Sequence, residues 1–164
     1  MISDVTYFRY KEQVFNICAI LDLYSRMVVG FSISHKNNVQ LTKGTFKQVY
    51  ENHKPESNLF FHANCESSYR SNTFCICLKS LEVTQSFSRA HVPYDNSVMK
   101  SFFSSLKREE LYRTKYRLEN EFRTAVKNYM LFYNEKRPHT KNGYKTPAKW
   151  ELKFFSKQAS KSNN

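Results

Sequence analysis

The sequence predicts one α/β domain in which three strands precede the first helix. Three β-rich runs, at residues 5–10, 14–21 and 28–34, are separated by polar turns, a pattern typical of a strand meander. Aromatic residues make up 16% of the 164-residue chain, so it has enough apolar surface to bury in one core. Helix-like and strand-like segments alternate after the meander, as in other α/β domains.

Each segment after the meander has its own signal. Residues 39–52 have helical spacing, and this helix is expected to end before Pro55, because proline cannot continue a helix. Residues 59–62 predict a short buried strand, residues 71–80 a helix and residues 83–87 the fifth strand.

Two long helices are expected in the C-terminal half, over about residues 97–112 and 117–135. Apolar residues at helical spacing predict their buried sides: Met99, Phe102, Phe103 and Leu106 in the first, and Leu118, Phe122, Ala125, Tyr129 and Phe132 in the second. Thr146 and Pro147 have the pattern of an N-cap and a first helical residue. We expect residues 1–152 to form the domain with a helical C-terminal extension, and residues 153–164 to form a polar tail.

The net charge of +12 is unevenly distributed. Residues 98–164 carry 16 Lys and Arg against 6 Asp and Glu, a net of +10, whereas residues 1–97 carry 10 against 8, a net of +2. This asymmetry favours nucleic acid as a partner, because neutralised phosphates supply most non-specific affinity. On charge alone, a basic surface that only confers solubility is an equal alternative.

The four cysteines lack the spacing of a zinc site. Cys75 and Cys77 are too close in sequence, and Cys18 lies in an apolar, strand-like run, so ordinary thiols in a reducing compartment are expected. No apolar run is long enough to span a bilayer, and the amino end lacks a signal-peptide pattern. A cytoplasmic protein is therefore expected.

Three motifs carry most of the functional information. Asp4 lies in Ser-Asp-Val-Thr-Tyr, Asn64 in His-Ala-Asn-Cys-Glu-Ser-Ser-Tyr, and Lys100 in Tyr-Asp-Asn-Ser-Val-Met-Lys-Ser-Phe-Phe. Four further motifs follow the same order along the chain: Leu-Asp-Leu-Tyr-Ser-Arg at 21–26, Ser-Ser-Leu-Lys-Arg-Glu at 104–109, Tyr-Asn-Glu-Lys-Arg-Pro-His at 133–139 and Gly-Tyr-Lys-Thr-Pro at 143–147.

Together these motifs resemble the retroviral-type integrase core of insertion-sequence transposases, the DDE family. The resemblance covers nearly the whole chain and implies an RNase H-like fold, with a five-stranded mixed sheet flanked by helices and the first strand beside the fourth. It implies double-stranded DNA as partner, a bacterial cytoplasmic location (on the nucleoid when bound to DNA), and catalysis by two Mg²⁺ or Mn²⁺ ions about 4 Å apart.

By this resemblance the catalytic triad falls at Asp4, Asn64 and Lys100, and only Asp4 keeps its carboxylate. The triad charge changes from −3 to zero, and an ammonium group repels a nearby dication, so a productive two-metal site is not expected. Glu66 occupies the position of a family glycine, so its side chain is expected to point elsewhere. Asp95 is expected to cap the next helix. Neither is expected to replace a lost ligand, and Asp4 is the only metal-ligand candidate.

The resemblance also suggests residues that contact DNA: Lys107, Arg108, Arg137 and His139. Lys100, Ser104 and Lys107 share one exposed helix face by their spacing. Two other polar residues of the motifs, Asp22 and His62, are expected to have structural roles rather than to bind metal. For Tyr69, a place in the core and contact with DNA are equal alternatives.

Three functions are compatible with these motifs. The first is a truncated and catalytically degenerate core from a decaying insertion sequence, because family members usually carry a helix-turn-helix segment before the first catalytic Asp. The second is a retained DNA-binding or transposase-interacting regulator, acting as a homo-oligomer or in mixed assembly with the full-length transposase. The third is an active nuclease with unusual metal ligands.

Overall fold

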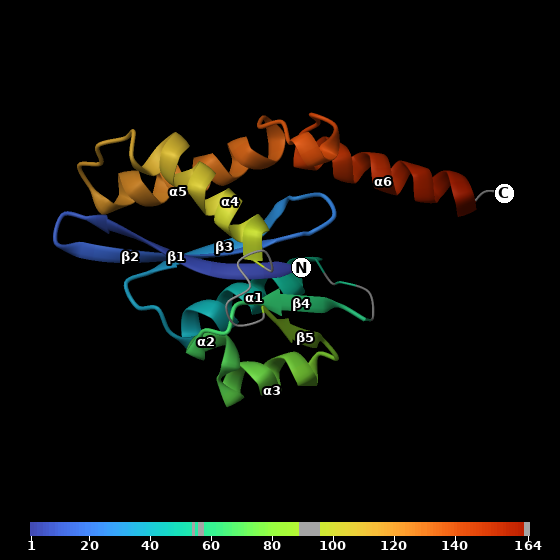
Figure 1. Cartoon of the computed structure of the whole chain (residues 1–164), viewed down its shortest axis with the longest axis horizontal. Coiled ribbons are helices and arrows are strands. Elements are labelled where there is room, and N and C mark those ends of the chain that lie inside the picture. The colour runs from blue at the N-terminus through green and yellow to red at the C-terminus, as the bar shows by residue number, and fades with distance from the viewer. Residues whose placement is uncertain (54, 56–57, 89–95, 163–164) are drawn as a thin grey trace.

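The computed structural model describes residues 1–53, 55, 58–88 and 96–162, and five strands form one mixed sheet (Figure 1). The order of strands in the sheet is β3-β2-β1-β4-β5. The meander comprises β1 (Ile2–Tyr10), β2 (Gln13–Leu21) and β3 (Val28–Ser34), which pair antiparallel; β4 (Phe60–Ala63) is parallel to β1, and β5 (Thr84–Phe87) is parallel to β4. The expected sheet, with the first strand central and beside the fourth, is confirmed.

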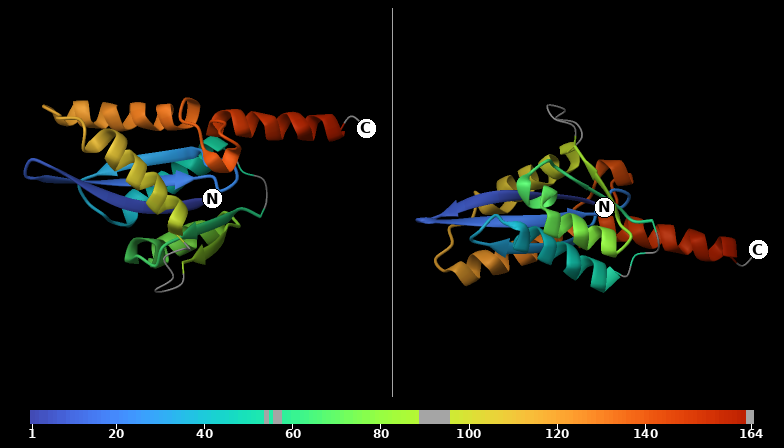
Figure 2. Two further views of the ribbon diagram at one scale, coloured as in Figure 1. Left: turned by 45° about the horizontal axis from the view of Figure 1, so that its top comes forward. Right: turned by 90° about the horizontal axis from the view of Figure 1, so that it is seen from below.

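Helices cover both faces of this sheet (Figures 1 and 2). One face carries α1 (Val39–His53), α2 (Ser67–Arg70) and α3 (Asn72–Ser80). The other carries α4 (Ser97–Leu106), its continuation η2 (Lys107–Leu111) and α5 (Glu119–Glu135). A short helix, η3 (Thr140–Asn142), leads to α6 (Pro147–Ser162), which extends away from the body of the molecule. No helix within the described residues is long and apolar enough to cross a membrane.

Side chains of β2 point alternately to the two faces of the sheet and contribute to a hydrophobic core on each face. Ala19 and Leu21 pack with α4 and α5, whereas Ile20, between them, packs with α1 and α3. Because successive side chains of a strand point to opposite faces, a strand covered on both sides is apolar throughout. Every residue of β2 from Phe15 to Leu21 is buried. Asn16 is the polar residue among them, and its Nδ2 donates a hydrogen bond to the carbonyl of Ser34 at the end of β3.

The apolar side predicted for the helix after residue 97 is confirmed, since all four of its members are buried. Its last turn, however, is a π-helix, in which the N–H of Tyr112 donates to the carbonyl of Lys107. The π-turn inserts one residue into the helical period and brings Leu111 into the core.

The buried side predicted for the helix over residues 117–135, which corresponds to α5, is wrong at two positions. Leu118 is 65% exposed and Phe132 is 45% exposed. Leu118 has an extended backbone before α5 begins, so helical periodicity does not set its direction. The buried face of α5 is instead formed by Phe122, Val126, Tyr129, Met130 and Tyr133.

The C-terminal segment is more helical than expected. Thr146 accepts a hydrogen bond from the backbone N–H of Lys149 at 3.3 Å, as an N-cap does, and Pro147 is the first residue of α6. This helix runs to Ser162 and therefore crosses the expected boundary between domain and tail at residue 152.

Candidate functional site

Asp4 and Asn64 are neighbours because of the parallel register of β1 and β4. Ser3 pairs with Ala63, so the next residue of each strand lies at the same edge of the sheet. Asn64 Nδ2 donates a hydrogen bond to Asp4 Oδ1 at 2.6 Å. Two motif positions that are 60 residues apart in sequence thus meet in space.

Both carboxylate oxygens of Asp4 accept hydrogen bonds from protein N–H groups. Oδ1 also accepts from the backbone N–H of Val5 at 2.9 Å, and Oδ2 accepts from Asn96 Nδ2 at 2.8 Å. Asn96 immediately precedes α4 and is only 7% exposed. The third motif therefore reaches Asp4 through an amide that the sequence analysis did not select.

Glu66 points toward this cluster, and the expectation that it points elsewhere is wrong. Its Oε1 accepts from Asn64 Nδ2 at 3.0 Å, and its backbone N–H donates to Asn64 Oδ1 at 3.2 Å. One amide can bridge two carboxylates because its NH₂ group offers two donors. The other residue considered as a substitute ligand, Asp95, lies outside the described residues.

Burial raises the pKa of Asp4 to about 6, and the negative charge of Glu66 adds to this shift. Hydrogen bonds from Val5 and Asn96, and the positive charge of Lys100, lower the same pKa. Lys100 is exposed on α4, and its positive charge is near enough to act on the carboxyl group of Asp4.

The residues at this position do not fit two divalent cations. Mg²⁺ prefers several carboxylate oxygens, whereas both oxygens of Asp4 face amide N–H donors and the neighbouring charge on α4 is positive. Within the described part of the chain, no three His, Cys, Asp or Glu side chains gather closely enough to hold a metal ion. The arrangement is that of a hydrogen-bonded polar cluster, and no metal-dependent step follows from it.

Asp22 and His62, both expected to be structural, have such contacts, and Tyr69 lies in the core. Asp22 Oδ2 accepts from the backbone N–H groups of Tyr24 and Ser25 and thereby fixes the turn between β2 and β3. His62 bonds two serine hydroxyls of the neighbouring strand and loop, at 2.9 and 3.1 Å. Tyr69 is fully buried, with its hydroxyl 2.7 Å from Ser3 Oγ.

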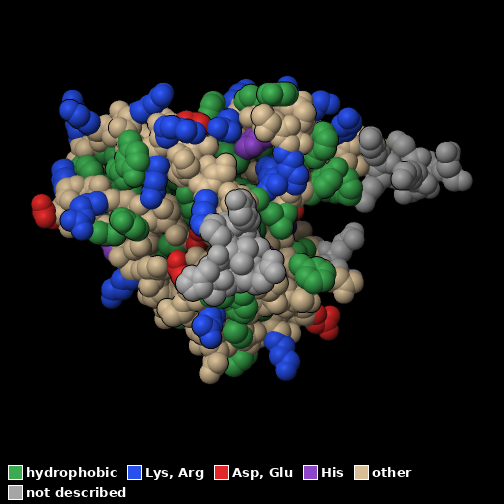
Figure 3. Space-filling view, in the orientation of Figure 1, with side chains coloured by type: hydrophobic (Ala, Val, Ile, Leu, Met, Phe, Trp, Pro, Cys, Tyr) green, Lys and Arg blue, Asp and Glu red, His purple; other side chains and the backbone are tan. Residues whose placement is uncertain are grey.

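The four residues expected to contact DNA fall into two places. Lys107 Nζ lies 5.3 Å from the centre of the Tyr7 ring on β1. Arg108, Arg137 and His139 instead line one groove of about 560 Å³ beside α4. Lys and Arg side chains are concentrated on this part of the surface, over α4 and α5 (Figure 3).

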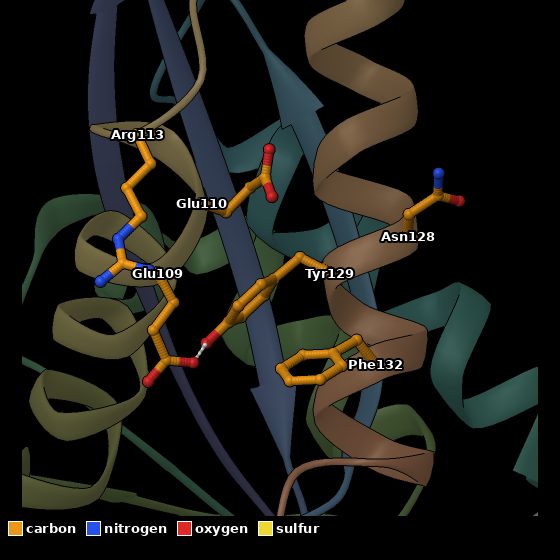
Figure 4. A pocket seen from close by; sticks show the side chains of 6 residues that line it. All are labelled: Glu109, Glu110, Arg113, Asn128, Tyr129 and Phe132. Atoms are coloured by element: carbon orange, nitrogen blue, oxygen red, sulfur yellow. Dashed lines mark hydrogen bonds between the residues drawn. The ribbon is translucent and has the colours of Figure 1, made fainter.

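An ion pair with Glu109 partly neutralises the positive charge of Arg137. Its guanidinium binds both carboxylate oxygens of Glu109, with Nη2 to Oε1 at 2.8 Å and Nε to Oε2 at 2.9 Å, and Nη2 also donates to Ser105 Oγ. Glu109 accepts a further hydrogen bond from Tyr129 on α5, and Figure 4 shows these two side chains pointing toward one another. These contacts tie the segment after α5 to η2, so Arg137 has a structural role in addition to lining the groove.

His139 is held neutral within the same groove. Burial, followed by the positive charges of Arg137 and Arg26, lowers the pKa of its imidazole to about 4. Its ring packs against Tyr133 with centroids 4.6 Å apart. At neutral pH this residue offers a polar atom rather than a charge.

Comparison with known proteins agrees with this architecture. A family model described as "Integrase core domain" matches residues 1–93, and a second model with the same description matches residues 81–147. A transposase for insertion sequence element IS904 from Lactococcus lactis is 31% identical over 151 residues, which cover 92% of this chain and 60% of that protein. Transposase InsF for insertion sequence IS3A from Escherichia coli is 30% identical over 152 residues, covering 92% and 53%.

Solved structures share the fold at low sequence identity. The HTLV-2 integrase catalytic core domain in complex with magnesium, in its dimeric form, superposes with a TM-score of 0.67 at 16% identity and covers 89% of this chain and 90% of that one. The simian T-cell lymphotropic virus intasome in complex with PP2A regulatory subunit B56 gamma gives a TM-score of 0.77 at 16% identity, covering 91% and 52%.

The sheet order, the helical layers and the position of Asp4 on the central strand define an RNase H-like integrase core. The chain belongs to the integrase core domain family. It spans between about half and three fifths of the length of the curated transposases that it matches.

Proposed function

We propose that this chain is a DNA-binding integrase-core protein of DNA transposition that does not itself catalyse strand cleavage or transfer. The observation that supports it most directly is the state of Asp4. Its two carboxylate oxygens bond amides of Asn64 and Asn96, and the family's third acidic position carries Lys100. Two-metal strand transfer needs converging carboxylates to hold both cations.

The DNA-binding part of this proposal is supported by charge. Residues 98–164 carry a net charge of +10, and Arg108, Arg137 and His139 are brought together in one groove. The curated relatives are transposases, whose substrate is DNA. Backbone phosphates attract such a surface without reading sequence, so binding is expected to be non-specific and to weaken steeply with salt.

The test is a pair of measurements on one preparation of purified protein. Fluorescence anisotropy with a labelled duplex at rising salt measures binding, and incubation of the same duplex with Mg²⁺ or Mn²⁺ measures cleavage. Salt-dependent binding without cleavage supports the proposal. Cleavage that disappears in Asp4→Ala refutes the non-catalytic part, and the absence of binding at low salt refutes the DNA-binding part.

A second candidate is regulation of an active transposase by mixed assembly. HTLV-2 integrase core, which shares this fold, has been solved in dimeric and trimeric forms. A folded core that lacks two of the three catalytic carboxylates would occupy a subunit position without contributing chemistry. Light scattering after co-purification with a full-length transposase distinguishes this candidate, because a mixed oligomer has a mass that neither protein gives alone.

A further inference from the structure

The groove beside α4 is lined by cations and hydroxyls. Arg26 comes from the turn between β2 and β3, Arg108 from η2, and Lys141 from η3. None of its lining residues within the described part of the chain is Asp or Glu. Three segments far apart in sequence thus contribute positive charge to one concave surface.

Two of these cations form no direct ion pair, although the negative charge of Asp22 acts on both of them. Within the described residues, neither Arg26 nor Lys141 forms an ion pair; the Lys141 ammonium instead donates to the carbonyl of Leu23 at 3.0 Å. Burial, followed by the positive charge of Arg26, lowers the pKa of Lys141, whereas the negative charge of Asp22 raises it. Like charges that line one groove repel each other, and an anion bound between them reduces that repulsion.

Arg26 is positioned by a tight turn. Its φ of 64° lies in the left-handed region, which side chains with a Cβ rarely adopt, and its N–H donates to the carbonyl of Asp22. The carboxylate of Asp22 fixes the same turn from the other side. The turn therefore sets the direction in which the Arg26 side chain leaves the backbone.

Hydroxyl donors complete the lining. Ser97, Ser101 and Ser105 recur every fourth residue and so share one face of α4, where all three line the groove. Ser97 and Ser101 are exposed, and within the described residues no side-chain hydrogen bond involves their hydroxyl groups. Guanidinium, ammonium and hydroxyl groups around a concave site match the oxygens of a phosphodiester.

We propose that this groove binds backbone phosphates of duplex DNA, and that Arg26 and Lys141 supply its main charged contacts. The inference rests on the proposed DNA-binding function and assigns that binding to a site. Arg108 extends the same contact along η2, whereas Arg137 is already paired with Glu109 and holds the wall of the groove.

The test compares two double variants that lose the same charge. Arg26→Gln with Lys141→Gln removes the two groove cations, and Lys47→Gln with Lys79→Gln removes two exposed cations from α1 and α3. The full chain is titrated with a labelled duplex by anisotropy at several salt concentrations. The plot of the logarithm of the binding constant against the logarithm of salt concentration has a negative slope, to which each phosphate contact contributes about 0.9. Loss of two contacts in the groove variant is expected to make this slope shallower by about 1.8. The control variant should change the slope much less.

Two single variants distinguish an effect of charge from an effect of misfolding. Arg26→Lys keeps the charge and should retain most of the slope, whereas Ser101→Glu puts a negative charge in the groove and should weaken binding. Equal slopes for groove and control variants, with circular dichroism unchanged, overturn the groove assignment while leaving DNA binding intact. If wild-type protein binds no duplex at low salt, the proposed function itself fails.

Free phosphate is the other source of this ligand chemistry. Orthophosphate is titrated into the wild type and the groove variant by calorimetry at constant ionic strength. Weak or undetectable heat, together with the loss of DNA affinity, supports a polymer ligand. Tight, saturable orthophosphate binding that depends on Arg26, without a change in DNA affinity, would assign the groove to a free anion and overturn the proposal.

Discussion

Asn64 donates a 2.6 Å hydrogen bond to Asp4, so an amide nitrogen faces this carboxylate from the end of the neighbouring strand. The same amide also bonds Glu66. The two N–H donors of the Asn64 amide bond the carboxylates of Asp4 and Glu66. Asparagine at this position therefore removes one negative charge and also holds two carboxylates together without a cation.

Magnesium at millimolar concentration should not raise the melting temperature of the wild-type protein. A ligand stabilises a fold only if it binds the native state, and the cluster around Asp4 offers N–H donors to an incoming cation. Differential scanning fluorimetry with and without Mg²⁺ measures this. A rise in melting temperature that disappears in Asp4→Ala would show that the site does hold the ion.

The double variant Asn64→Asp with Lys100→Glu should gain divalent-ion binding. It converts the amide and the ammonium beside Asp4 into carboxylates, with the register of β1 and β4 unchanged. Repulsion among the carboxylates should lower stability without metal, and Mg²⁺ or Mn²⁺ should restore it. Calorimetry checks the gain.

Each single variant is the control for this experiment. Asn64→Asp leaves the positive charge of Lys100 close to the ion, and Lys100→Glu leaves the amide donors in place. A folded double variant that binds no divalent ion would contradict the assignment of these positions to the family triad.

The carboxyl group of Asp4 should titrate near pH 6. Its folded pKa is raised above the ordinary 3.8, so its contribution to stability is fully present below pH 3.8 and is lost as the pH rises through about 6. Carbon-13 NMR of labelled aspartate measures the pKa. Glu66→Gln should lower it by removing a negative charge, and Lys100→Ala should raise it by removing a positive one. Opposite shifts would show that the two side chains do not act on Asp4 as the structure indicates.

Breaking the pair of Glu109 and Arg137 should destabilise the fold by about 1–2 kcal/mol, as expected for a two-pronged ion pair that is only a quarter exposed. Arg137 holds the pKa of Glu109 below its ordinary 4.5, so this stability is present above that pH and is lost as the pH falls. Urea unfolding of Glu109→Gln, Arg137→Met and the double variant gives the coupling energy. Additive losses at neutral pH would mean that the pair contributes nothing.

Most of the fold could be predicted because strand alternation and helix signals are local. The three strands of the meander and the helix before Pro55 lie within a few residues of the expected ranges. The π-turn at Lys107 and the exposure of Phe132 could not be predicted, since both depend on how η2 and α5 pack. Helical periodicity predicts the spacing of the buried residues on a helix. Which side of the helix is buried depends on the surface that it packs against.

The candidate site was only partly predictable. Motif spacing predicted that Asp4, Asn64 and Lys100 converge, but the direction of Glu66 and the buried amide of Asn96 depend on loop geometry. In the sequence, Arg26 is only the last residue of the motif at 21–26. No sequence signal predicted that it lines the same groove as Lys141, more than a hundred residues later. Such groupings arise from tertiary structure, where separation in sequence carries no information about distance.

Helix α6 leaves the body of the molecule (Figure 2). Aromatic residues of this helix contact Tyr24. Trp150, the chain's single tryptophan, lies 6.2 Å from Tyr24 in the turn between β2 and β3, and Phe154 lies 4.9 Å from the same ring. Intrinsic tryptophan fluorescence therefore reports only the docking of this helix, while the sheet and its two cores contain no such emitter. A thermal melt followed by emission will track release of the helix, and circular dichroism will track the sheet and all helices together, so a gap between the two midpoints measures how independently the projecting helix detaches.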